Sequence, residues 1–250
     1  ALRESVLSRP FDSEKKMYII DEVHMLTKEA FNALLKTLEE PPSHVIFVLA
    51  TTELHKVLPT VISRCQSFIF KSPTRLILRE MISGIVKKEG FIIDAESLDI
   101  IAFLGNGSFR DTQGVLQKLM SYSVDKKITR DETELITGAP ALSLLQDFII
   151  ELRDKNIDTL LVLIRKASTE NIDAHIFLQL LTEKIRTILR IRFSPQLQEL
   201  IKSEIGEDDF NFLHSIAKEK NNIDSKLLSE LLKVYVDMGQ AFIKYSPLEL

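Results

Sequence analysis

The chain has 250 residues, of which 45% are hydrophobic and 27% are charged, and its formal net charge at pH 7 is −4. These proportions are typical of a globular chain that is long enough for one large domain or for roughly two or three small ones. The negative balance excludes an overall basic excess, which would favour nucleic-acid binding, but not a local basic patch. The longest apolar runs, such as Val45–Ala50, are far below the roughly 18 residues that span a bilayer, so no membrane association is predicted.

The single cysteine, Cys65, excludes an intramolecular disulfide and a cysteine-rich zinc site within these residues. No secretory signal peptide is visible at the start of the chain. A reducing, cytoplasmic setting therefore fits best. Because the sequence opens at Ala1, in what looks like the middle of a helix, we expect a fragment or a processed chain.

Short apolar runs and amphipathic stretches alternate through the first 72 residues. The apolar runs predict strands at Met17–Asp21, Val45–Ala50 and Ser67–Phe70. Between the first two strands, apolar residues recur at helical spacing from Lys28 to Glu40, and Thr27 is placed to cap that helix. Alternation of strands and helices favours a parallel sheet.

The character of the sequence changes after Ser72-Pro73, and no further strand is predicted. Helices are expected over Thr74–Glu89 and Asp94–Leu104, and Ser108 is placed to cap a third helix that runs to Tyr122. From residue 141 onward strong amphipathic periodicity predicts an all-helical bundle. Its helices are expected at Ala141–Asp154, Ile157–Glu170, Asp173–Arg192, Pro195–Ile205, Asp208–Lys220 and Ser225–Tyr245.

The first predicted strand ends in two adjacent carboxylates, Asp21 and Glu22. Open α/β sheets bind ligands at the carboxyl ends of their strands. In phosphate-loop nucleotide hydrolases an acid at this place helps to hold Mg²⁺ beside the triphosphate. The alternative is a strand that leads into solvent, where acids are common.

The run from Asp21 to Pro42 resembles the ATPase core of bacterial clamp loaders, the gamma/tau subunits of DNA polymerase III, which are AAA+ ATPases. The resemblance continues through Leu49–Thr52 and Ser63–Cys65 and resumes at Gly107–Asp111. It is specific over residues 17–73, good over 74–138 and weak over 139–250, where only helical character and position support it.

The resemblance implies an α/β plus all-α chain in three parts. Residues 1–72 would form an incomplete AAA+ parallel-sheet domain that binds nucleotide. Residues 73–138 would form a three-helix lid domain, and residues 139–250 a helical collar domain for oligomerisation.

The resemblance also implies a role for each candidate site residue. Asp21 would be the Walker B acid near Mg²⁺, and Glu22 the carboxylate that positions or deprotonates water. Thr52 would be the sensor 1 residue close to the γ-phosphate of ATP. Arg64 would reach the ATP of a neighbouring subunit, and Arg110, as sensor 2, would contact phosphate in its own subunit. A planar, permanently charged guanidinium suits phosphate oxygens.

Ordinary structural roles remain open for these residues. Arg64 also reads as a surface arginine after a proline-led turn, Arg110 as a helix-start charge paired with Asp111, and Thr52 as a cap for the next helix. The histidines of this part lack metal-ligand spacing, and surface or core roles are favoured for His24, His44 and His55.

No Gly-x-x-x-x-Gly-Lys-Ser/Thr loop occurs in the chain, so the usual backbone cradle for phosphates is missing from these residues. In the resembled family this loop, two strands and a zinc module precede the part seen here. The family's first strand lies between those that correspond to Val45–Ala50 and Ser67–Phe70. We therefore expect these 250 residues alone to bind ATP poorly, to be inactive as an ATPase and to form a marginal sheet, with the loop in a longer parent chain.

The resemblance implies a clamp-loader ATPase of the DNA polymerase III holoenzyme that uses ATP and Mg²⁺ to load a sliding clamp on primer–template DNA. Its partners would be the sliding clamp, primer–template DNA and other clamp-loader subunits, both of its own family and of the delta and delta-prime types. One alternative is a non-hydrolysing scaffold subunit of the delta-prime type, against which the intact Asp21 and Glu22 argue. The other is a Holliday-junction helicase, whose winged third domain has no counterpart in the helical pattern of residues 141–250.

Overall fold

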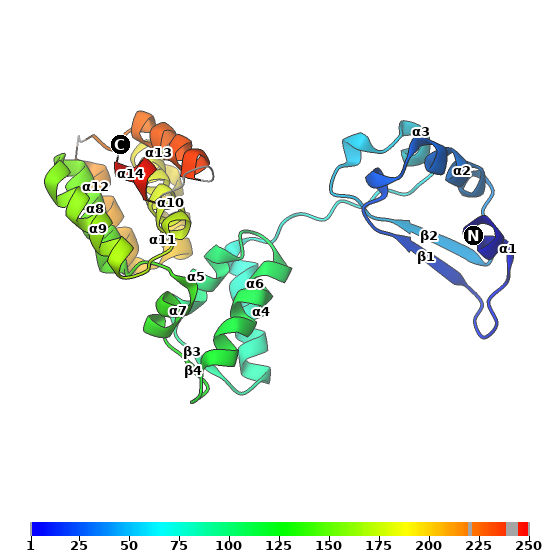
Figure 1. The fold of residues 1–250 in the computed structure, drawn as a ribbon, viewed down its shortest axis with the longest axis horizontal. Coiled ribbons are helices and arrows are strands. Elements are labelled where there is room, and N and C mark those ends of the chain that lie inside the picture. The colour runs from blue at the N-terminus through cyan, green and yellow to red at the C-terminus, as the bar shows by residue number, and fades with distance from the viewer. Residues whose placement is uncertain (1, 220–221, 239–244, 250) are drawn as a thin grey trace. The chain divides into compact units, whose positions relative to one another are not determined.

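The computed structural model of the chain describes residues 2–219, 222–238 and 245–249. The chain consists of two compact units, Ala1–Lys71 (unit 1) and Ser72–Leu250 (unit 2), shown in Figure 1. It is mostly helical and contains a small parallel sheet. The finer division into three domains, at 72/73 and at 138/139, stays a prediction.

Unit 1 contains two paired strands and several short helices. Strand β1 pairs in parallel with β2, in a register that joins Lys16 to Val45 and Ile20 to Leu49. The first two predicted strands and their parallel pairing are therefore confirmed to within a residue at each end. The elements of unit 1 are α1 (Leu2–Leu7), β1 (Lys16–Ile20), η1 (Val23–Met25), α2 (Lys28–Glu39), β2 (Val45–Leu49), η2 (Leu54–Lys56) and α3 (Pro59–Ile62).

Helix α2 begins and packs as its sequence predicts. The Thr27 side chain accepts a hydrogen bond from the Ala30 N–H group (3.2 Å), which satisfies one of the donors left open at the helix start. Phe31 on its inner face is buried in a small apolar cluster with Val57 and Val61. This cluster holds α2 and α3 together just beyond the ends of the two strands.

The third predicted strand, Ser67–Phe70, is wrong for this structure. Its residues form no strand, and Phe68, Ile69 and Phe70 are 72%, 83% and 94% exposed. A strand exists only where a neighbour pairs with its backbone groups. In the described part of unit 1 the sheet has two strands, β1 and β2, so this apolar segment has no strand beside it.

One face of the sheet in unit 1 is open to solvent. Met17 and Ile19 of β1, with Ile46 and Val48 of β2, point to this face and are between 40% and 69% exposed. On the opposite face the rings of Tyr18 and Phe47 stack with their centroids 5.5 Å apart. Uncovered apolar faces of this kind are unfavourable in water, which agrees with the expectation of an incomplete sheet.

Unit 2 is helical apart from one very short strand pair. Strands β3 and β4 pair in parallel, joining Ile92 to Lys127 and Ile93 to Ile128, so the expectation of no strand after residue 73 was wrong. Part of the predicted Ser225–Tyr245 helix, residues 239–244, lies outside the described residues. The elements are α4 (Arg75–Lys88), β3 (Ile92–Ile93), α5 (Ala95–Leu104), α6 (Phe109–Tyr122), β4 (Lys127–Ile128), α7 (Arg130–Thr137), α8 (Leu142–Asp154), α9 (Ile157–Thr169), α10 (Ala174–Phe193), η3 (Pro195–Leu197), α11 (Gln198–Ile205), α12 (Glu207–Lys218), α13 (Ser225–Met238) and α14 (Ser246–Glu249).

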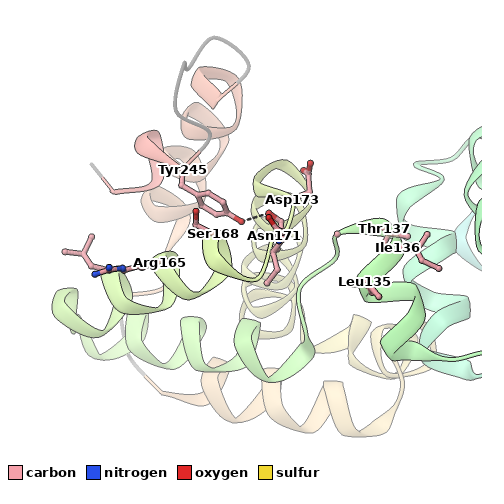
Figure 2. Close-up of a pocket in the computed structure, with 11 residues that line it drawn as sticks. Leu135, Ile136, Thr137, Arg165, Ser168, Asn171, Asp173 and Tyr245 are labelled. Atoms are coloured by element: carbon pink, nitrogen blue, oxygen red, sulfur yellow. Dashed lines mark hydrogen bonds between the residues drawn. The ribbon is translucent and has the colours of Figure 1, made fainter.

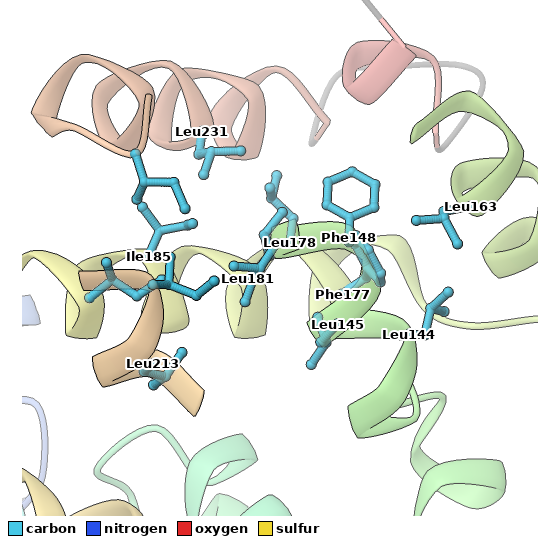
Figure 3. Close-up of a cluster of buried hydrophobic side chains, with 14 of the residues drawn as sticks. Leu144, Leu145, Phe148, Leu163, Phe177, Leu178, Leu181, Ile185, Leu213 and Leu231 are labelled. Atoms are coloured by element: carbon cyan, nitrogen blue, oxygen red, sulfur yellow. The ribbon is translucent and has the colours of Figure 1, made fainter. Parts of the chain in front are cut away.

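Two separate apolar clusters form the core of unit 2. The first is formed by the helices from α4 through α7 and is centred on Leu78, Ile101 and Leu116. The second is built around α10, whose fully buried Phe177 and Leu181 contact side chains from the surrounding helices (Figure 3). Pairs of apolar residues three and four positions apart explain why α10 is buried along most of its length.

One ion pair links the two clusters and another lies within the second. Arg75 of α4 lies 3.1 Å from Glu183 of α10, and Lys184 of the same helix pairs with Asp209 of α12.

No single helix among the described residues is long and apolar enough to cross a membrane. Only α7 and α8 taken together, with a bend of 71° between them, have that length and composition.

The turn that leads into α6 depends on a glycine. A Cβ atom added to Gly105 would lie 2.9 Å from the Thr112 Cβ atom and closer still to its hydroxyl oxygen. The Thr112 hydroxyl in turn donates to the Ser108 carbonyl (2.6 Å), and the Ser108 side chain caps α6 by accepting from the Asp111 N–H group (3.2 Å). Close contact at Gly105 therefore fixes where α6 begins.

We predict that Gly105→Ala destabilises unit 2 by about 1–3 kcal/mol, because the added methyl group overpacks the turn. Gly114→Ala is the matched control, since nothing lies within 4 Å of its added Cβ. In a helix interior that change should stabilise by about 0.5–1 kcal/mol. Thermal unfolding followed by far-ultraviolet circular dichroism measures both, and equal melting temperatures for the two variants would contradict the close contact.

Tyr245 ties the last described segment to the rest of the bundle. Its hydroxyl donates to the Ile172 carbonyl (2.8 Å), and its side chain is buried. Burial, with a smaller contribution from the Asp173 carboxylate, raises the pKa of Tyr245 from 10.0 to about 12. The phenol is therefore held in its neutral form.

The stability that Tyr245 contributes should be complete below about pH 10 and should fall as the pH rises toward 12. In that interval the unfolded chain has lost the phenolic proton while the native chain still holds it. Ionisation of tyrosine can be followed by its ultraviolet absorbance as the pH rises. The difference between the titration curves of the wild type and of Tyr245→Phe should have its midpoint near pH 12. A difference curve centred near pH 10 would show that the hydroxyl is not held as described.

Candidate functional site

The candidate site lies where β1 and β2 end. Backbone pairing continues past both strands. The Ala50 N–H group donates to the Ile20 carbonyl oxygen (2.9 Å), and the Val23 N–H group donates to the Ala50 carbonyl oxygen (2.9 Å). Asp21 and Glu22 follow β1, while the pair Thr51-Thr52 follows β2. Parallel pairing thus brings the two carboxylates and the two hydroxyl groups to the same edge of the sheet.

The structure brings three of the predicted site residues together. The Thr52 hydroxyl donates to Glu22 Oε2 (3.2 Å), and the Thr52 N–H group donates to the same oxygen over 3.4 Å. Asp21 Oδ1 accepts the Glu22 N–H group at 2.9 Å. Asp21, Glu22 and Thr52 therefore form one connected group, in which Asp21 is exposed to solvent.

Glu22 has an unusual backbone conformation. Its φ and ψ angles are 45° and 48°, in the left-handed region that residues with a Cβ seldom adopt. This conformation costs about 1–2 kcal/mol, and such residues often occur at functional sites. Val23, which is 1% exposed, anchors the next position in the apolar cluster of unit 1. The chain therefore turns sharply at Glu22, directly before the buried Val23.

His24 belongs to the same group, which the sequence did not indicate. Its side chain is only 7% exposed. Nδ1 lies 2.8 Å from Thr51 Oγ1 and 3.3 Å from Glu22 Oε2, and Nε2 lies 3.1 Å from Glu53 Oε2. The sequence pattern favours a surface or core role for His24. Its position three residues after Asp21, on the segment that leaves β1, is the one sequence signal that places it near this group.

Glu53 completes the polar group at this edge. Besides His24 it contacts Lys56, whose ammonium group lies 2.7 Å from Glu53 Oε1. The hydrogen bond from Lys56 is the main reason why the pKa of the Glu53 carboxyl is below its ordinary value, and burial opposes it. Glu53 therefore stays ionised beside the imidazole of His24.

Arg64 lies away from this group and is paired within unit 1. Its guanidinium is 2.7 Å from Glu39 Oε1 at the end of α2 and donates to the Thr60 carbonyl (2.8 Å). The side chain is 36% exposed, so the pair is open to water. Exposed ion pairs contribute at most about 1 kcal/mol, so this contact can open at little cost. The predicted contact of Arg64 with another subunit's ATP stays a prediction.

Arg110 belongs to unit 2 and lies in the first turn of α6, directly after the Ser108 cap. It is exposed, and no ion pair joins it to Asp111 in the part of the chain that the structure describes. An arginine in the first turn opposes the helix dipole. Its predicted contact with phosphate stays a prediction.

The chemistry of the group suits a hydrated Mg²⁺ ion. No cluster of three or more His, Cys, Asp or Glu side chains within the described ranges is placed to hold a metal. Mg²⁺ usually keeps several waters and takes only one or two carboxylates, so Asp21 with its neighbour Glu22 is compatible with it.

Cys65 packs against the apolar cluster of unit 1, and burial raises the pKa of its thiol.

A cavity of about 810 Å³ occurs in unit 2 and is lined by residues other than those of this group (Figure 2). It is open and lies between the end of α7 and the segment that joins α9 to α10. Leu135, Arg165 and Asn171 line it, with Tyr245. None of the predicted site residues lies there.

The sequence is similar to known proteins over most of its length. Residues 1–74 match the family described as DNA polymerase III, delta subunit. The chain is 37% identical over 212 residues to DNA polymerase III subunit tau of Bacillus subtilis, covering 85% of this chain and 38% of that protein. It is 32% identical over 232 residues to subunit gamma of Buchnera aphidicola from Schizaphis graminum, covering 92% of this chain and 62% of that protein.

One further sequence relative and one solved structure are also similar to the chain. Subunit gamma/tau of Mycoplasma genitalium is 44% identical over 133 residues, which cover 53% of this chain and 22% of that protein. The Bacillus subtilis clamp loader delta protein is similar in structure, with a TM-score of 0.41 and 18% identity over 99% of this chain and 80% of that chain. That score is too low to support an assignment.

The similarity is carried by the curated sequences. Two of these relatives are 37% and 32% identical over 85% and 92% of this chain. The chain spans between 22% and 62% of the length of the three curated relatives. The similarity to gamma and tau subunits of DNA polymerase III therefore extends over most of this chain and over only part of those proteins.

Proposed function

We propose that the chain is part of a clamp-loader ATPase subunit of the DNA polymerase III holoenzyme and acts in the cytoplasm. In this proposal ATP binding and hydrolysis drive the loading of a sliding clamp on primer–template DNA. The observation that carries it is the hydrogen-bonded group of Asp21, Glu22 and Thr52 at the ends of two parallel strands. That edge is where such sheets bind ligands. Unit 1 would be the incomplete AAA+ domain.

Each residue of the group has a role in this proposal. Asp21 would hold Mg²⁺ through a water or directly, and the bound ion would neutralise charge on the phosphate oxygens. Glu22 would orient the attacking water or accept its proton. The Thr52 hydroxyl would point toward the γ-phosphate, and Arg110 of unit 2 would supply a second phosphate contact within the same subunit.

In this proposal the phosphate cradle would come from residues other than these 250, which contain no Gly-x-x-x-x-Gly-Lys-Ser/Thr loop. The uncovered face of β1 and β2 and the unpaired segment 67–70 support this assignment. A further strand beside β2 would give that segment a partner. Until such a strand and loop are joined to them, we expect these residues to bind ATP poorly.

The helices after residue 139 would form the collar through which the subunits assemble. Exposed apolar side chains support this role, because apolar surface on a helix face favours association. They occur on α9 and on α13, at Ile157, Leu161, Val162, Leu232 and Val236. Other clamp-loader subunits, including the delta and delta-prime types, are the proposed partners, together with the clamp and the DNA.

A non-hydrolysing scaffold subunit is the second candidate. The match of residues 1–74 to a family described as a delta subunit favours it. The complete acid pair favours the ATPase instead, because a scaffold needs neither carboxylate. Hydrolysis by the full-length protein decides between the two.

We expect Glu22→Gln in the full-length protein to lower ATP turnover by about 10²–10⁴-fold, because the amide cannot accept a proton from water. Binding of ATP should change little, since the amide keeps the size and polarity of the carboxylate. Steady-state hydrolysis and titration with a fluorescent nucleotide measure the two quantities. Glu29→Gln, an exposed change in the first turn of α2, is the control, and full turnover by Glu22→Gln would refute the ATPase assignment.

Arg64→Ala should lower hydrolysis in the assembled complex by about 10³–10⁵-fold, as expected for an arginine supplied to a neighbour's phosphate. In mixed assemblies, wild-type neighbours should restore hydrolysis in the mutant's own pocket. Glu39→Gln removes the partner of Arg64 and should leave hydrolysis at or above the wild-type rate. Arg9→Ala is the control for losing an exposed arginine of unit 1. Normal hydrolysis by complexes that contain only Arg64→Ala would rule out the trans-acting role.

A further inference from the structure

We propose that His24 is a positioning residue that holds Glu22 in its working place at the edge of the sheet. This inference rests on the proposed function, in which Glu22 acts on water. His24 itself would touch neither nucleotide nor water in the reaction. It would act through Glu22, with Thr51 and Glu53 as its fixed supports.

The contacts of His24 distinguish it from an ordinary core histidine. All the polar partners of its ring are on the segments that follow β1 and β2, and its side chain is 7% exposed. Nδ1 faces the Thr51 hydroxyl at 2.8 Å and Glu22 Oε2 at 3.3 Å, while Nε2 faces Glu53 Oε2 at 3.1 Å. The ring therefore bridges the segment that carries Glu22 and the segment that follows β2.

The supports of the ring have contacts of their own. The Thr51 hydroxyl accepts the Glu53 N–H group at 3.0 Å, which holds the turn after β2 in shape. The Lys56 ammonium group also contacts the Glu53 carboxylate, 2.7 Å from Oε1 and 2.8 Å from Oε2. The His24 ring has polar contacts at both of its nitrogen atoms and is nearly buried, so it has little freedom to move. It can therefore restrict the position of the Glu22 carboxylate.

The role of Thr52 explains why Glu22 needs this second support. A threonine hydroxyl has one proton to donate. In this structure Thr52 donates it to Glu22 Oε2, but the proposed function requires the same hydroxyl to contact the γ-phosphate. When Thr52 turns to the phosphate, Glu22 loses that hydrogen bond, and Nδ1 of His24 remains as the side-chain contact that keeps its carboxylate in place.

The test uses three variants of His24 in the full-length protein, assembled with its partner subunits. Asparagine carries its amide nitrogen about as far along the side chain as Nδ1, glutamine about as far as Nε2, and leucine has neither. We expect His24→Leu and His24→Gln to lower kcat for ATP hydrolysis by about 10–100-fold, because small displacements of reacting groups have effects of this size. His24→Asn should keep at least about a third of the wild-type kcat, and KM and the Kd for ATP should stay within about twofold in all three.

A merely structural role would give a different result. The stability of the fold would then decide activity, and kcat would follow the melting temperature rather than the position of the amide. His44 is the matched control: it is the other partly buried histidine of unit 1, and its Nε2 lies 3.1 Å from the Val6 carbonyl. Leucine, glutamine and asparagine at position 44 should change the melting temperature but not kcat.

Wild-type kcat in His24→Leu, or equal kcat in His24→Asn and His24→Gln, would overturn the inference. If His24→Leu does not fold, the asparagine and glutamine variants decide the question by themselves. The Glu22→Gln variant separates this inference from the proposed function. Turnover that survives Glu22→Gln refutes the function, whereas loss in Glu22→Gln together with normal turnover in His24→Leu refutes only the role of His24.

Discussion

The parallel pairing of β1 and β2 is the constraint on which the candidate site depends. Its register joins Ile20 to Leu49, so the residues that follow both strands leave the sheet at the same edge. A shift of one residue would turn every side chain of a strand to the opposite face. It would also separate Glu22 from Thr52. Backbone hydrogen bonds between strands therefore determine the distances between side chains that no local sequence pattern controls.

Much of the fold was predictable because its signals are local. Thr27 and Ser108 cap α2 and α6 as their positions before apolar periodic stretches indicate. The strand expected at 67–70 was wrong because pairing in a sheet is not local. Apolar composition and alternation describe a segment that can join a sheet, but the neighbour that it needs lies elsewhere in the sequence. The short pair of β3 and β4 was missed for the same reason, since two residues give no periodic signal.

The site was predictable in part for a related reason. Asp21, Glu22 and Thr52 follow strands, and the ends of adjacent parallel strands meet, so their proximity could be expected. The contacts of His24 could not, because they depend on the left-handed turn at Glu22 and on the shape of the chain after β2. The partner of Arg64 likewise lies 25 positions earlier, at the end of α2. Spacing along the sequence carries no information on such pairs.

The uncovered face of the sheet links the stability of unit 1 to the geometry of its site. Met17, Ile19 and the facing residues of β2 are exposed there, although burying such side chains stabilises a fold by about 25 cal/mol per Å². A two-stranded sheet in water is marginal without further strands or a covering layer. Whatever covers this face would stabilise the register of β1 and β2, and with it the place of Glu22 between Thr52 and His24. Covering the sheet would thus also stabilise the arrangement of the carboxylates that the structure already shows.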